Sequence, residues 1–154
     1  MSHNLFDVAG RVAAVIGGGS GIGEAVARGL HDAGAEVAIL DAKGDAAARV
    51  AVSLGGAGTA ALLDIRDGAA VHSTLDLVAQ RHGRLDIVVC TPSINVRKTI
   101  LNYSGDEFDR VVAVNLKGSL NVLQAAGRIM TAQKRGSIII FSSIRSQVVE
   151  PGQS

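Results

Sequence analysis

Short apolar runs alternate with amphipathic segments along most of this chain. Five runs of mainly Val, Ile, Leu and Ala are short enough for buried strands, and they cover residues 12–16, 37–40, 59–63, 85–90 and 137–141. The segments between them carry apolar residues at three- and four-residue steps, as expected of helices that pack on a sheet. This alternation predicts a parallel sheet with helices on both faces. We therefore expect an α/β fold in a single domain that spans residues 1–154.

The longest helical segment is expected from about residue 106 to about residue 133. One face carries a stripe at helical spacing that should point to the core, formed by Phe108, Val112, Asn115, Ser119, Val122, Ala126 and Ile129. Asn115 is polar, and a buried amide without partners would cost about 1 to 3 kcal/mol. Asn115 is therefore expected to have a hydrogen-bond partner.

A glycine cluster follows the first apolar run directly, in the sequence VAAVIGGGSGIG. Gly17, Gly21 and Gly23 are spaced G-x-x-x-G-x-G, and apolar residues at helical spacing continue over residues 22–30. Glycines between a strand and a helix permit a tight turn and let a pyrophosphate approach the N–H groups that open the helix. A flexible surface turn is the alternative, but the position between strand and helix favours a phosphate cradle.

An acidic residue, Asp41, ends the second run roughly twenty positions after the last glycine. A carboxylate there can accept hydrogen bonds from the adenosine ribose hydroxyls, and its charge would repel a 2′-phosphate. This arrangement favours NAD over NADP. The alternative is that Asp41 only starts a turn or caps the next helix, a role that Asp45 could fill equally well.

Several motifs together resemble the amino-terminal part of a short-chain dehydrogenase/reductase: GGGSGIG, LDAK, LLDI, VNLKG and FSSIRSQVVEPGQS. They occur in the family's order and cover essentially all of the residues. The resemblance implies a Rossmann-type doubly wound parallel sheet with strand order 3-2-1-4-5, truncated here after the fifth strand. It also implies NAD as the cofactor, hydride transfer involving an alcohol or ketone substrate, and a homo-oligomer, commonly a tetramer.

The resemblance also assigns residues to the cofactor. Asp64 and Ile65 match the pair that meets the adenine ring, although Asp64 could instead cap the helix that begins near Asp67. The residues expected to contact the cofactor are Gly17, Gly19, Ser20, Gly21, Ile22, Gly23, Asp41, Asp64, Ile65 and Cys90.

Two polar residues match catalytic positions of the family. Ser143 corresponds to the serine that hydrogen-bonds the substrate carbonyl or hydroxyl. Asn115, in VNLKG, corresponds to the asparagine that helps to hold a water in a proton relay, and a buried asparagine that bonds only backbone is the alternative. The segment INVRK, with Arg97 and Lys98, is faintly similar to sugar-acid dehydrogenases of the family and could meet an anionic substrate, unless the pair is simply solvated.

The fourth run departs from the family pattern. The family usually carries Asn-Asn-Ala-Gly after this strand, where this chain has Cys-Thr-Pro-Ser from Cys90 onward, and it usually has threonine at Ile16. If strands one and four are neighbours, the two departures lie side by side and replace a polar contact by an apolar one. Burial in a strand explains Cys90 better than nucleophilic chemistry, because no histidine is near in the sequence.

The family's acid/base tyrosine and its lysine would fall beyond Ser154. The only tyrosine among these residues, Tyr103, precedes the long helical segment and does not match the motif. We therefore expect a fragment of an oxidoreductase that is inactive alone. The alternative is a natural remnant that serves as a non-catalytic dinucleotide-binding or interaction module. With nothing after it, the fifth strand would be a bare apolar edge, which favours the fragment.

Composition excludes several other functions. The net charge of +1 provides no basic field for nucleic acid, and no apolar run approaches membrane-spanning length. The first residues lack the pattern of a signal peptide, and a single cysteine suits a reducing compartment, so a cytoplasmic protein is expected. The four histidines show no pair at metal-ligand spacing, and we expect no metal site.

Overall fold

The computed structural model describes residues 7–55 and 59–148. Within these residues, five parallel strands form one sheet in the order β3-β2-β1-β4-β5. The strands are β1 Val12–Ile16, β2 Glu36–Asp41, β3 Thr59–Leu62, β4 Ile87–Cys90 and β5 Ser137–Ile140. The α/β class and the strand order 3-2-1-4-5 are therefore confirmed. The first residues, where no signal peptide is expected, and the end of the motif FSSIRSQVVEPGQS lie outside the described residues.

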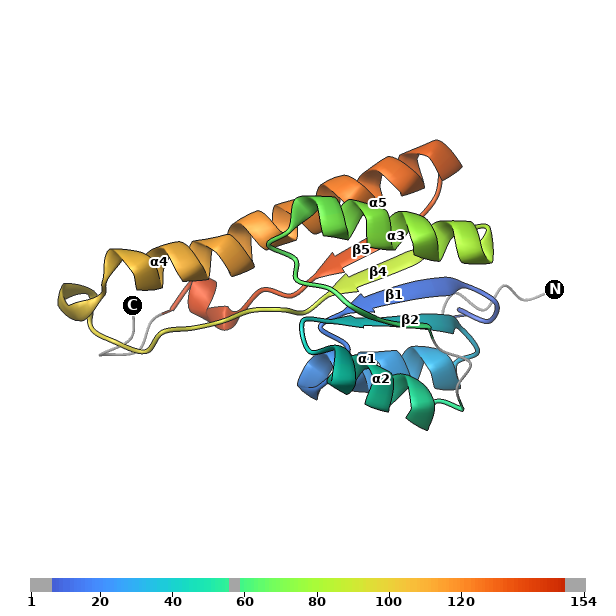
Figure 1. Ribbon diagram of the computed structural model, residues 1–154, viewed down its shortest axis with the longest axis horizontal. Coiled ribbons are helices and arrows are strands. Elements are labelled where there is room, and N and C mark those ends of the chain that lie inside the picture. The colour runs from blue at the N-terminus through green and yellow to red at the C-terminus, as the bar shows by residue number, and fades with distance from the viewer. Residues whose placement is uncertain (1–6, 56–58, 149–154) are drawn as a thin grey trace.

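Helices cover both faces of this sheet (Figure 1). The helices are α1 Gly21–Asp32, α2 Gly44–Ser53, α3 Gly68–His82, α4 Gly105–Val112 and α5 Ser119–Gln133. Figure 1 shows α1 and α2 on one face and α3 with α5 on the other, so the sheet is the middle of three layers. In such sheets the ligand lies at the carboxyl ends of the strands. None of the described helices is both long and apolar enough to cross a membrane.

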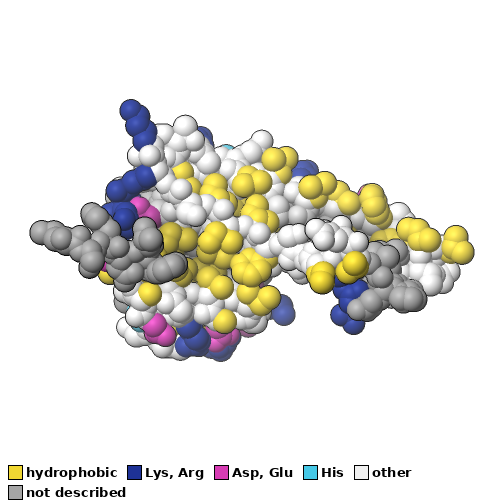
Figure 2. All heavy atoms as spheres, turned by 180° about the vertical axis from the view of Figure 1, so that it is seen from behind, with side chains coloured by type: hydrophobic (Ala, Val, Ile, Leu, Met, Phe, Trp, Pro, Cys, Tyr) yellow, Lys and Arg dark blue, Asp and Glu magenta, His cyan; other side chains and the backbone are white. Residues whose placement is uncertain are grey.

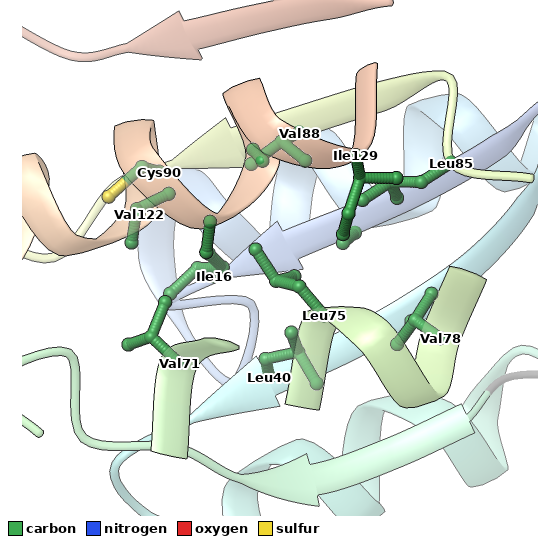
Figure 3. Close-up of a cluster of buried hydrophobic side chains, with 14 of the residues drawn as sticks. Ile16, Leu40, Val71, Leu75, Val78, Leu85, Val88, Cys90, Val122 and Ile129 are labelled. Carbon is green, nitrogen blue, oxygen red and sulfur yellow. The ribbon is translucent and has the colours of Figure 1, made fainter. Parts of the chain in front are cut away.

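The central strand β1 is buried on both faces, and its side chains divide between two cores. Ile16 packs in the core beneath α3 and α5, where Figure 3 shows it near Leu75 and Val122. Val15 points the opposite way and packs with Ile39 against α1 and α2. Every residue of β1 is at most 2% exposed, which explains why the sequence of this strand is an unbroken apolar run. Burial of each large aliphatic side chain contributes about 1.5 to 3 kcal/mol.

The long helical segment is interrupted where the sequence predicts a regular helix. A π-helical turn, Ala113–Gly118, separates α4 from α5. The expected core-facing stripe is wrong for its first half, because Phe108 is 59% exposed and Asn115 is exposed as well. Val122 and Ile129, in the second half, are buried. Figure 1 shows the reason: α4 projects beyond the carboxyl ends of the strands, whereas α5 lies over the sheet.

The strand β5 forms one edge of the sheet in the described part of the chain. Ile138 packs against the core beneath α5, whereas Ile139 is 47% and Phe141 is 43% exposed. Side chains alternate along a strand, so the exposed pair belongs to the face that carries α1 and α2. Those helices contact β1, β2 and β3 instead. Figure 2 shows apolar side chains gathered at the centre of the side turned away in Figure 1.

Candidate functional site

The glycine-rich turn lies at the carboxyl end of β1, where the strand order reverses between β2 and β4. Open parallel sheets bind ligands at such a switch point. A cavity of about 810 Å³ opens here. Its wall contains most residues expected to contact a cofactor, namely Gly17, Ser20, Gly21, Ile22, Gly23, Asp41, Asp64 and Ile65.

Two glycines are required by the close packing of this turn. A Cβ on Gly23 would lie 2.0 Å from the carbonyl oxygen of Gly17. Gly17 has a φ of +79°, and a Cβ there would lie 2.4 Å from Thr91 Oγ1. Thr91 donates to the Ile16 carbonyl at 3.1 Å and so ties the turn to the end of β4. Sequence analysis did not assign this role to Thr91, because the two segments are far apart along the chain.

The first turn of α1 faces the cavity without a side-chain cap. Ser20 occupies the position before the helix, and its side chain makes no capping hydrogen bond. The N–H groups at the start of an α-helix have no partner within the helix, and the helix dipole favours negative charge there. The structure can therefore hold an anionic group such as a phosphate at this point.

The carboxylate of Asp41 sits at the end of β2, between the glycine turn and α2. Its Oδ2 accepts the Gly19 N–H at 2.9 Å, and its Oδ1 accepts the Lys43 N–H at 2.9 Å. Asp41 thus starts a turn and lines the cavity at the same time, but it does not cap α2. Gly19 lies outside the cavity wall, and Asp45 lies within the first turn of α2 rather than at its cap.

Asp64 and Ile65 follow β3 and form another part of the wall. Asp64 pairs with Arg66, whose Nε lies 3.0 and 2.9 Å from the two carboxylate oxygens. This pairing holds the pKa of Asp64 below its ordinary value. Capping of α3 by Asp64 is wrong, because Asp67 accepts the Ala70 N–H at 3.0 Å and caps that helix.

A second cavity of about 590 Å³ adjoins the first, and the two share Ile22 and residues 91–95 as a common wall. Cys90, Asn115 and Ser143 line the second cavity, so the fold brings both expected catalytic residues together with Cys90. Tyr103 lines it too, although sequence analysis set this residue aside. Among the residues that the structure describes, no group of three or more His, Cys, Asp or Glu could hold a metal ion.

Asn115 and Ser143 make different kinds of contact within this second cavity. Asn115 accepts the Ile94 N–H and donates to the Ile94 carbonyl, both at 2.9 Å. The expected partner therefore exists, but the expected burial is wrong, and both of these hydrogen bonds go to backbone. Ser143 Oγ accepts the Arg145 N–H at 3.2 Å, which leaves the hydroxyl proton for another acceptor.

A family model described as short chain dehydrogenase matches residues 11–154. The chain belongs to the short-chain dehydrogenase/reductase family. "Short-chain dehydrogenase reductase 5" of Arabidopsis thaliana is 33% identical over 146 residues, which are 93% of this chain and 56% of that protein. The chain spans about half the length of the curated relatives that it matches first.

Solved structures of this family superpose closely on the chain. A short-chain type dehydrogenase/reductase from Mycobacterium marinum has a TM-score of 0.92 at 31% identity, covering 97% of this chain and 62% of that one. A 3-ketoacyl-(acyl-carrier-protein) reductase from Brucella melitensis, complexed with NADH, has a TM-score of 0.88 at 28% identity. The match covers 95% of this chain and 62% of the reductase.

The two departures from the short-chain dehydrogenase/reductase pattern are neighbours in the sheet. Ile16 and Cys90 are register partners on β1 and β4, and Figure 3 shows both in the same buried cluster. Cys90 is only 2% exposed, and this burial raises the pKa of its thiol to about 11, opposed to a smaller extent by a contact with Ser119. An apolar contact therefore occupies this place, and the thiol is protonated at neutral pH.

Native Cys90 is expected to react with a thiol reagent at pH 8 about 100-fold more slowly than the unfolded chain, because the thiolate is the reactive form. The measurement is the release of the coloured product from dithiobisnitrobenzoate. The same chain in urea serves as the control, and it should be labelled at its single cysteine. Equal rates in the native and unfolded states would contradict the buried, protonated thiol.

Proposed function

We propose that these residues form the NAD-binding part of an oxidoreductase that transfers hydride between nicotinamide and an alcohol or ketone. The observation that carries this proposal is the cavity at the switch point, which joins the glycine turn, the uncapped start of α1 and Asp41. NAD supplies the hydride donor or acceptor when bound. The NADH complex of the Brucella melitensis relative supports this choice of cofactor.

Each part of the first cavity suits one part of the dinucleotide. The N–H groups at the start of α1 would hold the pyrophosphate. Asp41 would accept hydrogen bonds from the adenosine ribose, and Ile65 would contact the adenine ring. Gly17 and Gly23 keep the turn narrow enough for this approach, and Gly21 supplies a positive φ at the start of α1. The nicotinamide would then lie toward the second cavity.

The second cavity provides groups for the substrate. The Ser143 hydroxyl would donate to the substrate oxygen and orient it. Asn115 would keep the segment around Ile94 in place through its two hydrogen bonds. A serine proton is not mobile near neutral pH, so proton transfer requires a more acidic group. We therefore expect these 154 residues alone to bind the cofactor without turnover.

A non-catalytic dinucleotide-binding module is the second candidate. It is favoured by the apolar pair of Ile16 and Cys90, which replaces polar residues of the family near the expected position of the nicotinamide. Both candidates bind NADH. The intact mass of the protein isolated from its source distinguishes them: a mass well above 15.7 kDa supports the enzyme, and a mass equal to it supports the module.

The partners of the whole protein follow from the same proposal. A small alcohol or ketone is the expected substrate, and a homo-oligomer is the expected assembly. Exposed apolar residues along α4, the π-helical turn and α5 support self-association, because large exposed apolar patches often mark interfaces. They are Phe108, Leu116, Leu120 and Leu123. The cytoplasmic location stays a prediction.

Titration with NADH and NADPH tests the assignment of Asp41. We expect NADH to bind about 10-fold more tightly than NADPH, because the carboxylate repels a 2′-phosphate. In Asp41→Asn the preference should shrink by about 10-fold, since the charge is lost. Asp45→Asn is the matched control, because Asp45 lies outside the cavity wall. Failure of the unchanged chain to bind NADH would overturn the proposed function, and an unchanged NADH/NADPH preference in Asp41→Asn would overturn the role of Asp41.

A further inference from the structure

The glycine turn is held from outside the cavity by a side chain of α2. Arg49 Nη2 donates to the carbonyl oxygen of Gly19 at 2.8 Å. The N–H of Gly19 donates to Asp41 Oδ2 at 2.9 Å. Both backbone polar groups of Gly19 are therefore engaged, one by the end of β2 and the other by α2.

Arg49 is itself anchored by an acidic residue of α1. Its Nη2 lies 2.7 Å from Glu24 Oε2, and its Nη1 lies 3.3 Å from Oε1. Glu24 also accepts two hydrogen bonds from Arg28, at 2.7 and 3.2 Å. Hydrogen bonds from Arg49, and secondarily from Arg28, lower the pKa of Glu24 to about 2. The anchor is thus ionised across the neutral range, and it joins the first turn of α1 to α2.

The turn needs such a restraint because its sequence supplies little stiffness. Residues 17–19 are three successive glycines, and glycine loses more backbone freedom on ordering than any other residue. Ser20 adds no side-chain cap at the start of α1. If the turn became ordered only when a ligand arrived, the ordering would lower the affinity.

We propose that Arg49 is a positioning residue for the pyrophosphate of the bound dinucleotide, acting through the Gly19 carbonyl with Glu24 as its anchor. Arg49 lies outside the walls of both cavities, so it acts on the ligand through the turn. The inference rests on the proposed dinucleotide binding. It adds that α2 preorganises the turn before the cofactor binds.

Arg28 provides a matched control on the same carboxylate. Arg28 pairs with Glu24 and donates to Ser53 Oγ at 2.9 Å, and neither of these contacts involves the glycine turn. Arg28→Gln and Arg49→Gln each remove one positive charge and one partner of Glu24. The variants therefore share the electrostatic change and differ in the contact with Gly19.

The experiment is a fluorescence titration with NADH of the unchanged chain and of three variants. Arg49→Gln should raise the Kd of NADH about fivefold to tenfold, because an ordering cost returns, whereas Arg28→Gln should stay within about twofold. Arg49→Lys should recover part of the affinity, since an ammonium can still donate to the carbonyl. Competition with ADP should weaken more in Arg49→Gln than competition with adenosine, which lacks phosphates.

The outcomes separate this inference from the proposed function. Binding by the unchanged chain, with equal Kd values for Arg49→Gln and Arg28→Gln, would overturn the role of Arg49 alone. Equal losses for ADP and adenosine would also overturn it, because they indicate a general structural effect. No NADH binding by the unchanged chain would overturn the proposed function together with this inference.

Discussion

Replacing Gly23 with alanine is expected to lower the free energy of unfolding by about 2 to 3 kcal/mol, as overpacking does. The new Cβ would lie 2.0 Å from the carbonyl oxygen of Gly17, 2.7 Å from its carbonyl carbon and 2.9 Å from Thr91 Oγ1. Two of these atoms are backbone, so no side-chain rotation relieves the clash, and the turn must move away from α1. NADH binding should weaken by about 100-fold, because the displaced turn no longer presents its N–H groups.

Gly29→Ala is the matched control for this substitution. Gly29 lies in the same helix, and a Cβ there would meet no atom within 4 Å. Alanine should stabilise the helix by about 0.5 to 1 kcal/mol, because glycine loses more backbone freedom on folding. Urea unfolding followed by circular dichroism measures both variants, and a shift of both midpoints in the same direction would refute the close approach of the turn to α1.

Replacing Asp86 with alanine is expected to destabilise the fold by about 2 to 3 kcal/mol, because it removes a buried carboxylate and leaves a buried backbone N–H without its acceptor. Asp86 is 6% exposed and immediately precedes β4. Arg84 Nε and Nη2 each donate to it at 2.6 Å, and the Val12 N–H donates at 2.9 Å. Removal of the carboxylate leaves the backbone of β1 and a guanidinium without their acceptor.

The same carboxylate predicts a dependence of stability on pH. Burial alone would raise the pKa of Asp86, but Arg84 and the Val12 N–H outweigh it and hold the pKa below its ordinary value of 3.8. A depressed carboxylate pKa contributes stability above the unfolded value, and this contribution is lost as the pH falls through the folded value. Below about pH 4 the free energy of unfolding of the unchanged chain should therefore fall more steeply than that of Asp86→Ala, because the variant has no carboxylate at this position to protonate.

Asp76→Ala is the control for Asp86→Ala, because its carboxylate pairs with an arginine but is not buried. Asp76 binds Arg128 on the surface, with side-chain exposures of 34% and 56%. Solvent screens such pairs, so the loss should stay below about 1 kcal/mol. Urea unfolding at pH 7 measures both variants. Equal destabilisation by the two substitutions would show that burial of Asp86 adds nothing to its ion pair.

Local patterns were sufficient for much of the fold and the first cavity. The unbroken apolar run of β1 indicated a strand buried on both faces, because the pattern of apolar residues is visible within a few consecutive positions of the sequence. The spacing of Gly17, Gly21 and Gly23 indicated a narrow turn for the same local reason. Asp41 was placed at the cavity by its position at the end of β2.

Expectations failed where a residue's surroundings come from distant parts of the chain. The helical stripe predicted burial of Phe108, yet α4 extends past the sheet and leaves this side chain exposed. The sequence indicated that Asn115 needs a hydrogen-bond partner. That this partner is the backbone of Ile94 depends on how the segment after β4 passes the π-helical turn. A period predicts which face of a helix is apolar, and it does not predict where the sheet ends.

The sequence by itself determined the succession of strands and helices along the chain, the glycine turn and the acidic end of β2. Backbone preferences and hydrophobic periods act over a few residues, so a short stretch of sequence is enough to show them. Only the tertiary structure decided which distant groups meet. Thr91 reaches the Ile16 carbonyl because β4 lies beside β1. Arg49 reaches Gly19 because α2 packs beside the turn. Such contacts depend on sheet order and helix packing, which join residues with no local pattern in common.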